Sequence, residues 1–264
     1  MLATNEIVKY DNFLNTIPLK GFTSFELDLL MVLCQRVRDK EDDVIQLPFT
    51  DLQKLMTLES NMTVNEFRKA VDKMNHKLCQ TVCHFKTEDT SAFFVLFPTF
   101  ITNFSERTLT VRVNPDFAFI LNRISRNFTR FELREFTMLK SKYAKNLYRQ
   151  LKQFRHTGHY FKTIDEFKIL LDCPKSYSNK IFIRDCVKPA IDELIALECF
   201  DDLVFKAHRS HKRGAPITNI EITFKAEEQI PGQLSLVNFI SSAPSSPKKK
   251  SLLDEELERL IRDN

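Results

Sequence analysis

The sequence predicts an α+β protein made of two similar halves in tandem, followed by a flexible C-terminal tail. Two observations support this prediction: one motif and the pattern of elements after it occur twice, and the composition changes beyond residue 228. The chain has 264 residues, of which 43% are hydrophobic and 28% are charged, enough for two domains with cores of their own. We therefore expect an N-terminal domain at 1–125, a C-terminal domain at 126–228 and a tail at 229–264.

The repeated motif is Phe22–Leu27, which recurs in similar form as Phe128–Leu133. In each copy a threonine precedes a helical pattern and a glutamate follows three residues later, which is the capping box that starts helices. Each copy is followed by a short amphipathic helix, a longer helix and strand-like segments. The expected helices are 51–56, 64–78, 164–171 and 179–197, and the expected strands are 80–86, 93–103, 203–207 and 217–224. A helix, a helix–turn–helix and a β-hairpin in this order predict a winged helix, so we expect two tandem winged-helix domains related by pseudo-symmetry.

The first helix of the second half is expected to be longer than its counterpart, because the second copy of the repeat contains extra residues there. Apolar side chains with a period of 3.6 residues mark this helix. They are Phe136, Leu139, Tyr143, Leu147, Leu151 and Phe154. Pro189 lies inside the last predicted helix and is expected to kink it, leaving 179–187 as a rigid segment.

The composition excludes several functional classes. The chain has four glycines and no Gly-Lys-Ser/Thr, so it lacks the loop with which P-loop ATPases bind phosphates. The six cysteines mostly lie inside apolar patterns, so we expect reduced core thiols, no metal site and no cofactor. A nuclease or relaxase would need a His-x-His pair and a nucleophilic tyrosine; no such histidine pair is present, and we expect no enzymatic activity. No apolar run reaches the roughly 20 residues of a membrane span, so we expect a cytoplasmic protein without a membrane partner.

Positive charge is concentrated in the second half of the chain. Residues 1–125 contain 14 Lys and Arg against 16 Asp and Glu, whereas residues 126–228 contain 20 against 14. In the stretch 126–155, nine cations face only two acidic residues, and several cations recur at helical spacing opposite the apolar positions. One-sided charge of this kind favours contact with DNA phosphates over the alternative, a solvated helix face, which normally mixes both signs. The expected phosphate contacts here are Arg126, Arg130, Lys142, Lys145, Arg149, Lys152 and Arg155.

The turn of the second helix–turn–helix carries hydrogen-bonding side chains of the kind that read base edges in the major groove. We expect base contacts from Lys175, Ser176, Tyr177, Ser178, Asn179, Lys180 and Arg184. The alternative is that Ser and Asn only cap the helix and that Tyr177 packs; capping is favoured for Ser178 alone, and base reading for Arg184. A basic loop between the last two strands adds expected phosphate contacts at Lys206, Arg209, Lys212 and Arg213.

Four segments in chain order carry a resemblance to a known family: Asn5–Tyr10, Asn127–Leu133, Leu151–Arg155 and Cys173–Tyr177. They resemble the iteron-binding initiators of theta-replicating plasmids, of the type found in low-GC Gram-positive bacteria. The resemblance implies two winged-helix domains that bind directly repeated origin sequences (iterons) as a monomer. It also implies a homodimer, joined through the N-terminal domain, that binds an operator inverted repeat and represses its own gene.

The same resemblance implies that binding opens an AT-rich segment and recruits the host initiator ATPase and the replicative helicase. This chain departs from the family pattern in its acidic N-terminal domain. The alternative to an initiator is a winged-helix transcriptional repressor without a replication role. Direct repeats beside an AT-rich stretch near the gene would favour the initiator, and a lone operator palindrome would favour the repressor.

The tail contains a segment, 233–239, that is similar to the peptides that dock in the bacterial sliding clamp. We expect its apolar side chains to fill a pocket of the clamp and Gln233 to hydrogen-bond at the edge. The apolar side chains are Leu234, Leu236 and Phe239. A terminal strand packed on the second domain is the alternative.

Overall fold

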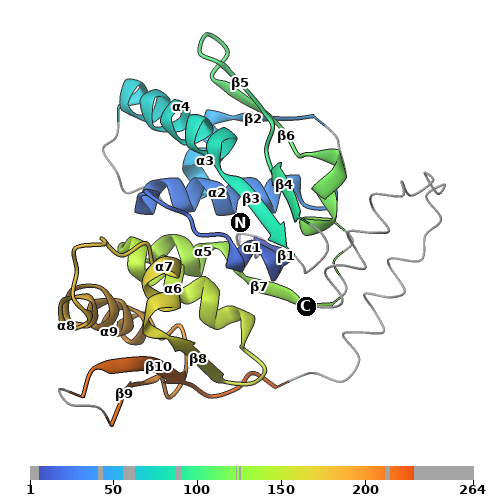
Figure 1. Ribbon diagram of the computed structural model, residues 1–264. Helices are drawn as coiled ribbons and strands as arrows, with labels where there is room; N and C mark the ends of the chain where they lie inside the picture. The colour runs from blue at the N-terminus through green and yellow to red at the C-terminus, as the bar shows by residue number, and fades with distance from the viewer. Residues whose placement is uncertain are drawn as a thin grey trace.

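The structure, a computed structural model, describes residues 6–40, 44–55, 63–86, 91–122, 124, 126–211 and 215–228. Two α+β domains lie one above the other in Figure 1, with the first domain at the top. Each has a helix–turn–helix followed by antiparallel strands, which confirms the two tandem winged helices. None of the described helices is both long and apolar enough to cross a membrane. The predicted clamp-binding residues Gln233, Leu234, Leu236 and Phe239 lie outside the described residues.

The first domain combines a group of packed helices with two small sheets. Its helices are α1 (Phe13–Thr16), α2 (Ser24–Val37), α3 (Phe49–Leu55), α4 (Val64–Gln80) and the 3-10 helix η1 (Pro115–Ile120). Its strands form a sheet in the order β2 (Ile45–Pro48), β6 (Thr108–Arg112), β5 (Thr99–Asn103), and a hairpin of β3 (Val82–Lys86) and β4 (Ser91–Val95). Thr23 forms the predicted capping box with Glu26 at the start of α2, and Thr63 and Glu66 start α4 in the same way.

The second domain has the same order of elements. Its helices are α7 (Ile164–Leu170), α8 (Asn179–Phe182), the π-helical turn η2 (Ile183–Val187) and α9 (Lys188–Ala196). Its sheet has the order β8 (His159–Thr163), β10 (Ile217–Thr223), β9 (Val204–Arg209). The helix predicted at 179–197 is divided into α8, η2 and α9. The π-helical turn ends two residues before Pro189, whose missing N–H interrupts the regular helical hydrogen bonds.

The second copy of the repeated motif forms a strand, so the helix start predicted at Thr129 is wrong. Strand β7 (Phe128–Glu132) pairs antiparallel with β1 (Ile7–Asp11), with Val8 opposite Phe131. The hydroxyl of Thr129 is fully buried and donates to Oδ1 of Asn12 at 2.8 Å instead of capping a helix. A capping box describes only local preference, and here a strand distant in sequence offers better partners for the backbone.

The predicted long helix is divided into α5 (Leu133–Met138) and α6 (Lys142–Gln153). The hydroxyl of Ser141 caps α6 by accepting from the N–H of Tyr143 at 3.1 Å, and the backbone is extended at Leu139 and Ser141. A domain boundary between residues 125 and 126 would also separate β7 from its partner β1. We therefore place the division of the chain after α6.

Helix α6 lies between the two domains, in contact with α2 and β7 on one side and α9 on the other. Its Arg149 is fully buried, and its guanidinium Nη1 and Nη2 donate to the carbonyls of Leu14 (3.1 Å) and Ile17 (3.2 Å). These carbonyls lie at the C-terminal end of α1, where a helix leaves acceptors without partners. The guanidinium of Arg149 on α6 thus supplies hydrogen-bond donors to the carbonyl groups at the C-terminal end of α1.

Replacing Arg149 with methionine, which keeps the apolar stem, should destabilise the fold by about 2 kcal/mol. Each buried carbonyl left unsatisfied costs about 1–3 kcal/mol, partly offset because the guanidinium no longer has to be desolvated. Arg134→Met, at an exposed position on α5, should change stability by less than about 0.5 kcal/mol. Urea denaturation measures both variants, and an equal effect in the two would contradict a supporting role for Arg149.

Candidate nucleic-acid interface

The turn before α8 is built from local hydrogen bonds. Helix α7 ends in a turn in which the N–H of Cys173 donates to the carbonyl of Lys168 at 2.9 Å. The hydroxyl of Ser178 accepts from the N–H of Ile181 at 3.3 Å and caps α8. The residues between these two contacts therefore form a fixed loop that precedes the second helix of the helix–turn–helix.

The predicted base-reading residues divide into an exposed and a packed group. Tyr177 packs against the core, and the Asn179 amide donates to the carbonyl of Ile217 at 3.1 Å, so both help to hold the loop in place. The exposed members are Lys175, Ser176, Ser178, Lys180 and Arg184. The packing alternative thus applies to Tyr177 and the capping alternative to Ser178. The side chains of Lys175, Ser176, Lys180 and Arg184 face solvent.

A stripe of cations begins on α8 and continues along the exposed side of η2 and the start of α9. Lys180, Arg184 and Lys188 are all exposed and are spaced four residues apart. Sequence reasoning missed Lys188, although its spacing from Arg184 is the signal that would have identified it. We call these three residues the α8 stripe.

Arg184 makes an exposed ion pair with its neighbour Asp185. Its Nε and Nη2 lie 2.5 and 2.8 Å from the two carboxylate oxygens, and the pKa of Asp185 is lowered by these hydrogen bonds. Because the Arg184 side chain is 67% exposed, water competes strongly for the pair and it adds little stability. The guanidinium can therefore exchange this carboxylate for an acceptor on a ligand at small cost.

The prediction that α6 binds phosphates with one face is wrong, because most of the cations on that face are buried in the protein. Lys145 is fully buried, and its ammonium contacts the Asp28 carboxylate and, at 3.0 Å, the carbonyl of Phe136. Burial lowers the pKa of Lys145 and raises that of Asp28 to about 7, although the lysine pulls the latter down. Arg149 is bound to the carbonyls described above, so neither side chain can reach a phosphate.

The remaining cations near α6 are also engaged by carboxylates. Lys142 lies 2.8 Å from Asp172, and Lys152 lies 3.4 Å from Glu135. Both Lys152 and Arg155 are buried and contact Glu227, at 3.6 and 3.7 Å. The one-sided charge of α6 thus faces acidic groups of neighbouring elements, which the helical period alone does not reveal.

Other predicted phosphate contacts remain accessible. Arg126, Arg130, Lys206 and Arg209 are exposed, and Arg209 donates to the carbonyl of Ala215 at 3.0 Å beside the loop between β9 and β10. Lys212 and Arg213 lie outside the described residues.

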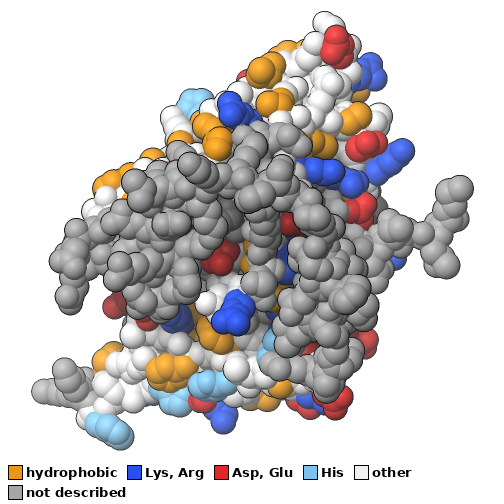
Figure 2. All heavy atoms as spheres, turned by 90° about the vertical axis from the view of Figure 1, so that its right-hand side faces the viewer, with side chains coloured by type: hydrophobic (Ala, Val, Ile, Leu, Met, Phe, Trp, Pro, Cys, Tyr) orange, Lys and Arg blue, Asp and Glu red, His pale blue; other side chains and the backbone are white. Residues whose placement is uncertain are grey.

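The exposed face of the second sheet is mixed in charge. The Glu221 carboxylate hydrogen-bonds Nε2 of His159 at 3.0 Å and of His208 at 2.8 Å, and these contacts lower its pKa. Figure 2 shows histidine side chains gathered over this second, lower domain.

The first domain offers a smaller basic surface on α4, the second helix of its own helix–turn–helix. Lys69, Lys73 and His76 are exposed there and line a shallow, open hollow together with Asp72 and Lys77. Sequence reasoning did not single out these residues, because the acidic balance of the first half concealed a local cluster. In the described residues, exposed cations therefore lie on the second helix of the helix–turn–helix in each domain.

The chain is similar to known proteins in sequence and in fold. The family described as "Initiator Replication protein, WH1" matches residues 7–152, and "Initiator Rep protein, WH2" matches residues 163–224. The curated "Probable replication protein rep" of Bifidobacterium longum (strain NCC 2705) is 39% identical over 192 residues, which span 72% of this chain and 65% of that relative.

The crystal structure of the Pi initiator protein in complex with iteron DNA is similar in fold. The TM-score is 0.64 at 16% identity, over 86% of this chain and 100% of the Pi chain. The WH1 match ends within α6, which agrees with a division of the chain after that helix. The chain belongs to the family of initiator replication proteins, with a WH1 and a WH2 winged-helix domain.

Proposed function

We propose that this protein initiates replication of the plasmid that encodes it by binding directly repeated origin sequences. The α8 stripe is the observation that carries the proposal, because it lies on the helix that winged-helix and related proteins insert into the major groove. The Pi initiator, which has the same fold, is described in complex with iteron DNA, and this supports the same class of ligand here.

The contacts are proposed to divide by type. We propose that the exposed side chains of the turn before α8, of α8 and of η2 read base edges. They are Lys175, Ser176, Lys180 and Arg184. Lys188 would bind the phosphate backbone, as would Arg126, Arg130, Lys206, Arg209, Lys212 and Arg213. Helix α4 of the first domain would add a second contact through Lys69 and Lys73.

Family membership supports the later steps of the proposal. A monomer would bind the repeats, open the origin and recruit the host initiator ATPase and the replicative helicase. A homodimer would bind an operator inverted repeat and repress the gene, and the segment 233–239 would bind the sliding clamp. A repressor without a replication role is the second candidate, and the same DNA experiment separates the two.

Footprinting of the purified protein on the DNA upstream of its gene, at two salt concentrations, should show protection over direct repeats. Successive protected repeats should lie one or two helical turns apart, since each is contacted from the same side of the duplex. Protection of a lone palindrome would favour the repressor. Salt-sensitive binding without any footprint would leave only a general DNA-binding protein.

Two variants of the α8 stripe should separate base reading from backbone contact. Arg184→Ala should weaken binding to the preferred sequence by about tenfold and relax preference at one base position. Lys188→Ala should weaken binding to all sequences and reduce the slope of log K against log salt by about one.

Lys225→Ala is the control for these variants, because Lys225 is equally exposed but follows β10 at the end of the sheet away from the β9–β10 loop. It should leave both the sequence preference and the salt slope unchanged. Identical behaviour of the Arg184 and Lys188 variants across sequences would contradict the proposed division of roles.

A further inference from the structure

Asp172 occupies a backbone conformation in which glycine is the least costly residue. Its φ is +53°, at the end of α7, where the N–H of Asp172 donates to the carbonyl of Ile169 at 3.2 Å. Helices commonly end in this left-handed conformation, usually with glycine, because a Cβ atom there costs roughly 1–2 kcal/mol. Aspartate tolerates this conformation better than most residues do and, unlike glycine, it places a carboxylate at the end of α7.

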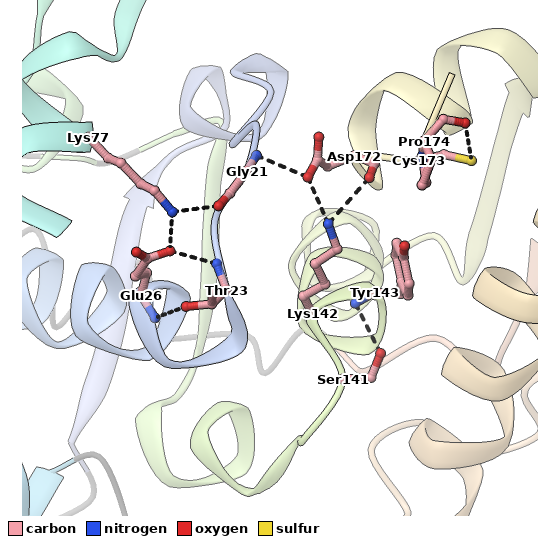
Figure 3. A network of polar contacts seen from close by, with 10 residues as sticks. All are labelled: Gly21, Thr23, Glu26, Lys77, Ser141, Lys142, Tyr143, Asp172, Cys173 and Pro174. Carbon is pink, nitrogen blue, oxygen red and sulfur yellow. Dashed lines mark hydrogen bonds and ion pairs between the residues drawn. The ribbon is translucent and has the colours of Figure 1, made fainter. Parts of the chain in front are cut away.

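The Asp172 carboxylate joins the two domains directly. One of its oxygens accepts from the N–H of Gly21 in the first domain at 3.0 Å and from the Lys142 ammonium of α6 at 2.8 Å. Figure 3 shows the carboxylate pointing toward both groups, with Lys142 also bonded to the Asp172 carbonyl. The loop that precedes α8 begins immediately after Asp172.

The contacts continue beyond Gly21 to the basic helix of the first domain. The Gly21 carbonyl accepts from the Lys77 ammonium of α4 at 2.5 Å. The same ammonium contacts Glu26, the capping residue of α2, also at 2.5 Å. A chain of polar contacts therefore runs from α4 through Gly21 to Asp172, and so to the start of the loop before α8 (Figure 3).

We infer that Asp172 is a positioning residue that fixes the distance and orientation between α4 and α8, and so makes the protein selective for the spacing of its two contacts on DNA. This inference rests on the proposed function. In Figure 1 α4 and α8 both lie toward the left side, in the upper and lower domains. One inserted base pair moves the second contact by about 3.4 Å and rotates it by about 35°, so a rigid link penalises the wrong spacing.

The test uses Asp172→Gly, which removes the carboxylate and relieves the backbone strain, so loss of folding is not the expected result. Asp202→Gly is the matched control, since Asp202 has a φ of +55° and is exposed in the loop before β9. Three kinds of labelled duplex are compared. The first carries one footprinted repeat, and the second carries the same repeat with one or two base pairs inserted between its two protected halves. The third carries only the half that the second domain binds. Fluorescence anisotropy measures binding of the full-length protein to each.

The wild type and Asp202→Gly should bind the intact repeat best and lose affinity with each insertion. Asp172→Gly should bind the half-repeat like the wild type and the intact repeat about fivefold or more weakly. It should also lose less affinity on insertion than the wild type does. An unchanged spacing preference would overturn the inference, and so would an equal loss on the half-repeat, because Asp172 would then act within the second domain. Failure of the wild type to prefer the repeat would instead overturn the proposed function.

Discussion

The buried guanidinium of Arg149 is the interaction on which the position of α6, the helix between the two domains, depends. A cation enters a protein interior only where acceptors surround it, and here the acceptors are carbonyls at the end of α1. Lys145, on the same helix, forms an ion pair with Asp28 of α2, so α6 has a second polar contact with the first domain. Removing one partner of such contacts costs more than the intact pair contributes, so α6 is held in one orientation against the first domain. Helix α9 of the second domain packs on the other side of α6, and the contacts of Asp172 with Gly21 and Lys142 add a direct link between the two domains.

Much of the fold could be predicted because its signals are local. The Thr23 capping box, the helices of both helix–turn–helix units and the final hairpin follow from caps and periodicity within a few residues. The exposed residues around α8 were found for the same reason, since turn-forming and hydrogen-bonding side chains cluster there. Lys188 was missed, although an exposed cation four residues after Arg184 continues the same side of the helix.

The two largest errors share one physical origin, which is a partner distant in sequence. The segment around Thr129 has a helix-starting pattern, but β1 lies more than a hundred residues away and supplies a ladder of backbone hydrogen bonds. The sequence of α6 predicts an exposed polar side, but in the structure that side faces the carboxylates of Asp28, Glu135 and Glu227. A periodic pattern separates apolar from polar sides and does not say whether water or another element covers the polar one.

Because many cations of α6 contact groups inside the protein, the net charge of the second half overstates the positive charge available to bind DNA. The second half of the chain has an excess of cations, but those of α6 are largely neutralised by internal carboxylates or bound to backbone carbonyls. They hold the domains together and are not available to release counterions from DNA. In the proposed complex, the salt dependence of binding should therefore follow the number of exposed cations that contact DNA, and not the net charge of the chain. With fewer phosphate contacts, a larger share of the binding free energy of the proposed complex would come from base contacts. The orientation of α8 would then matter more than the total charge of the domain.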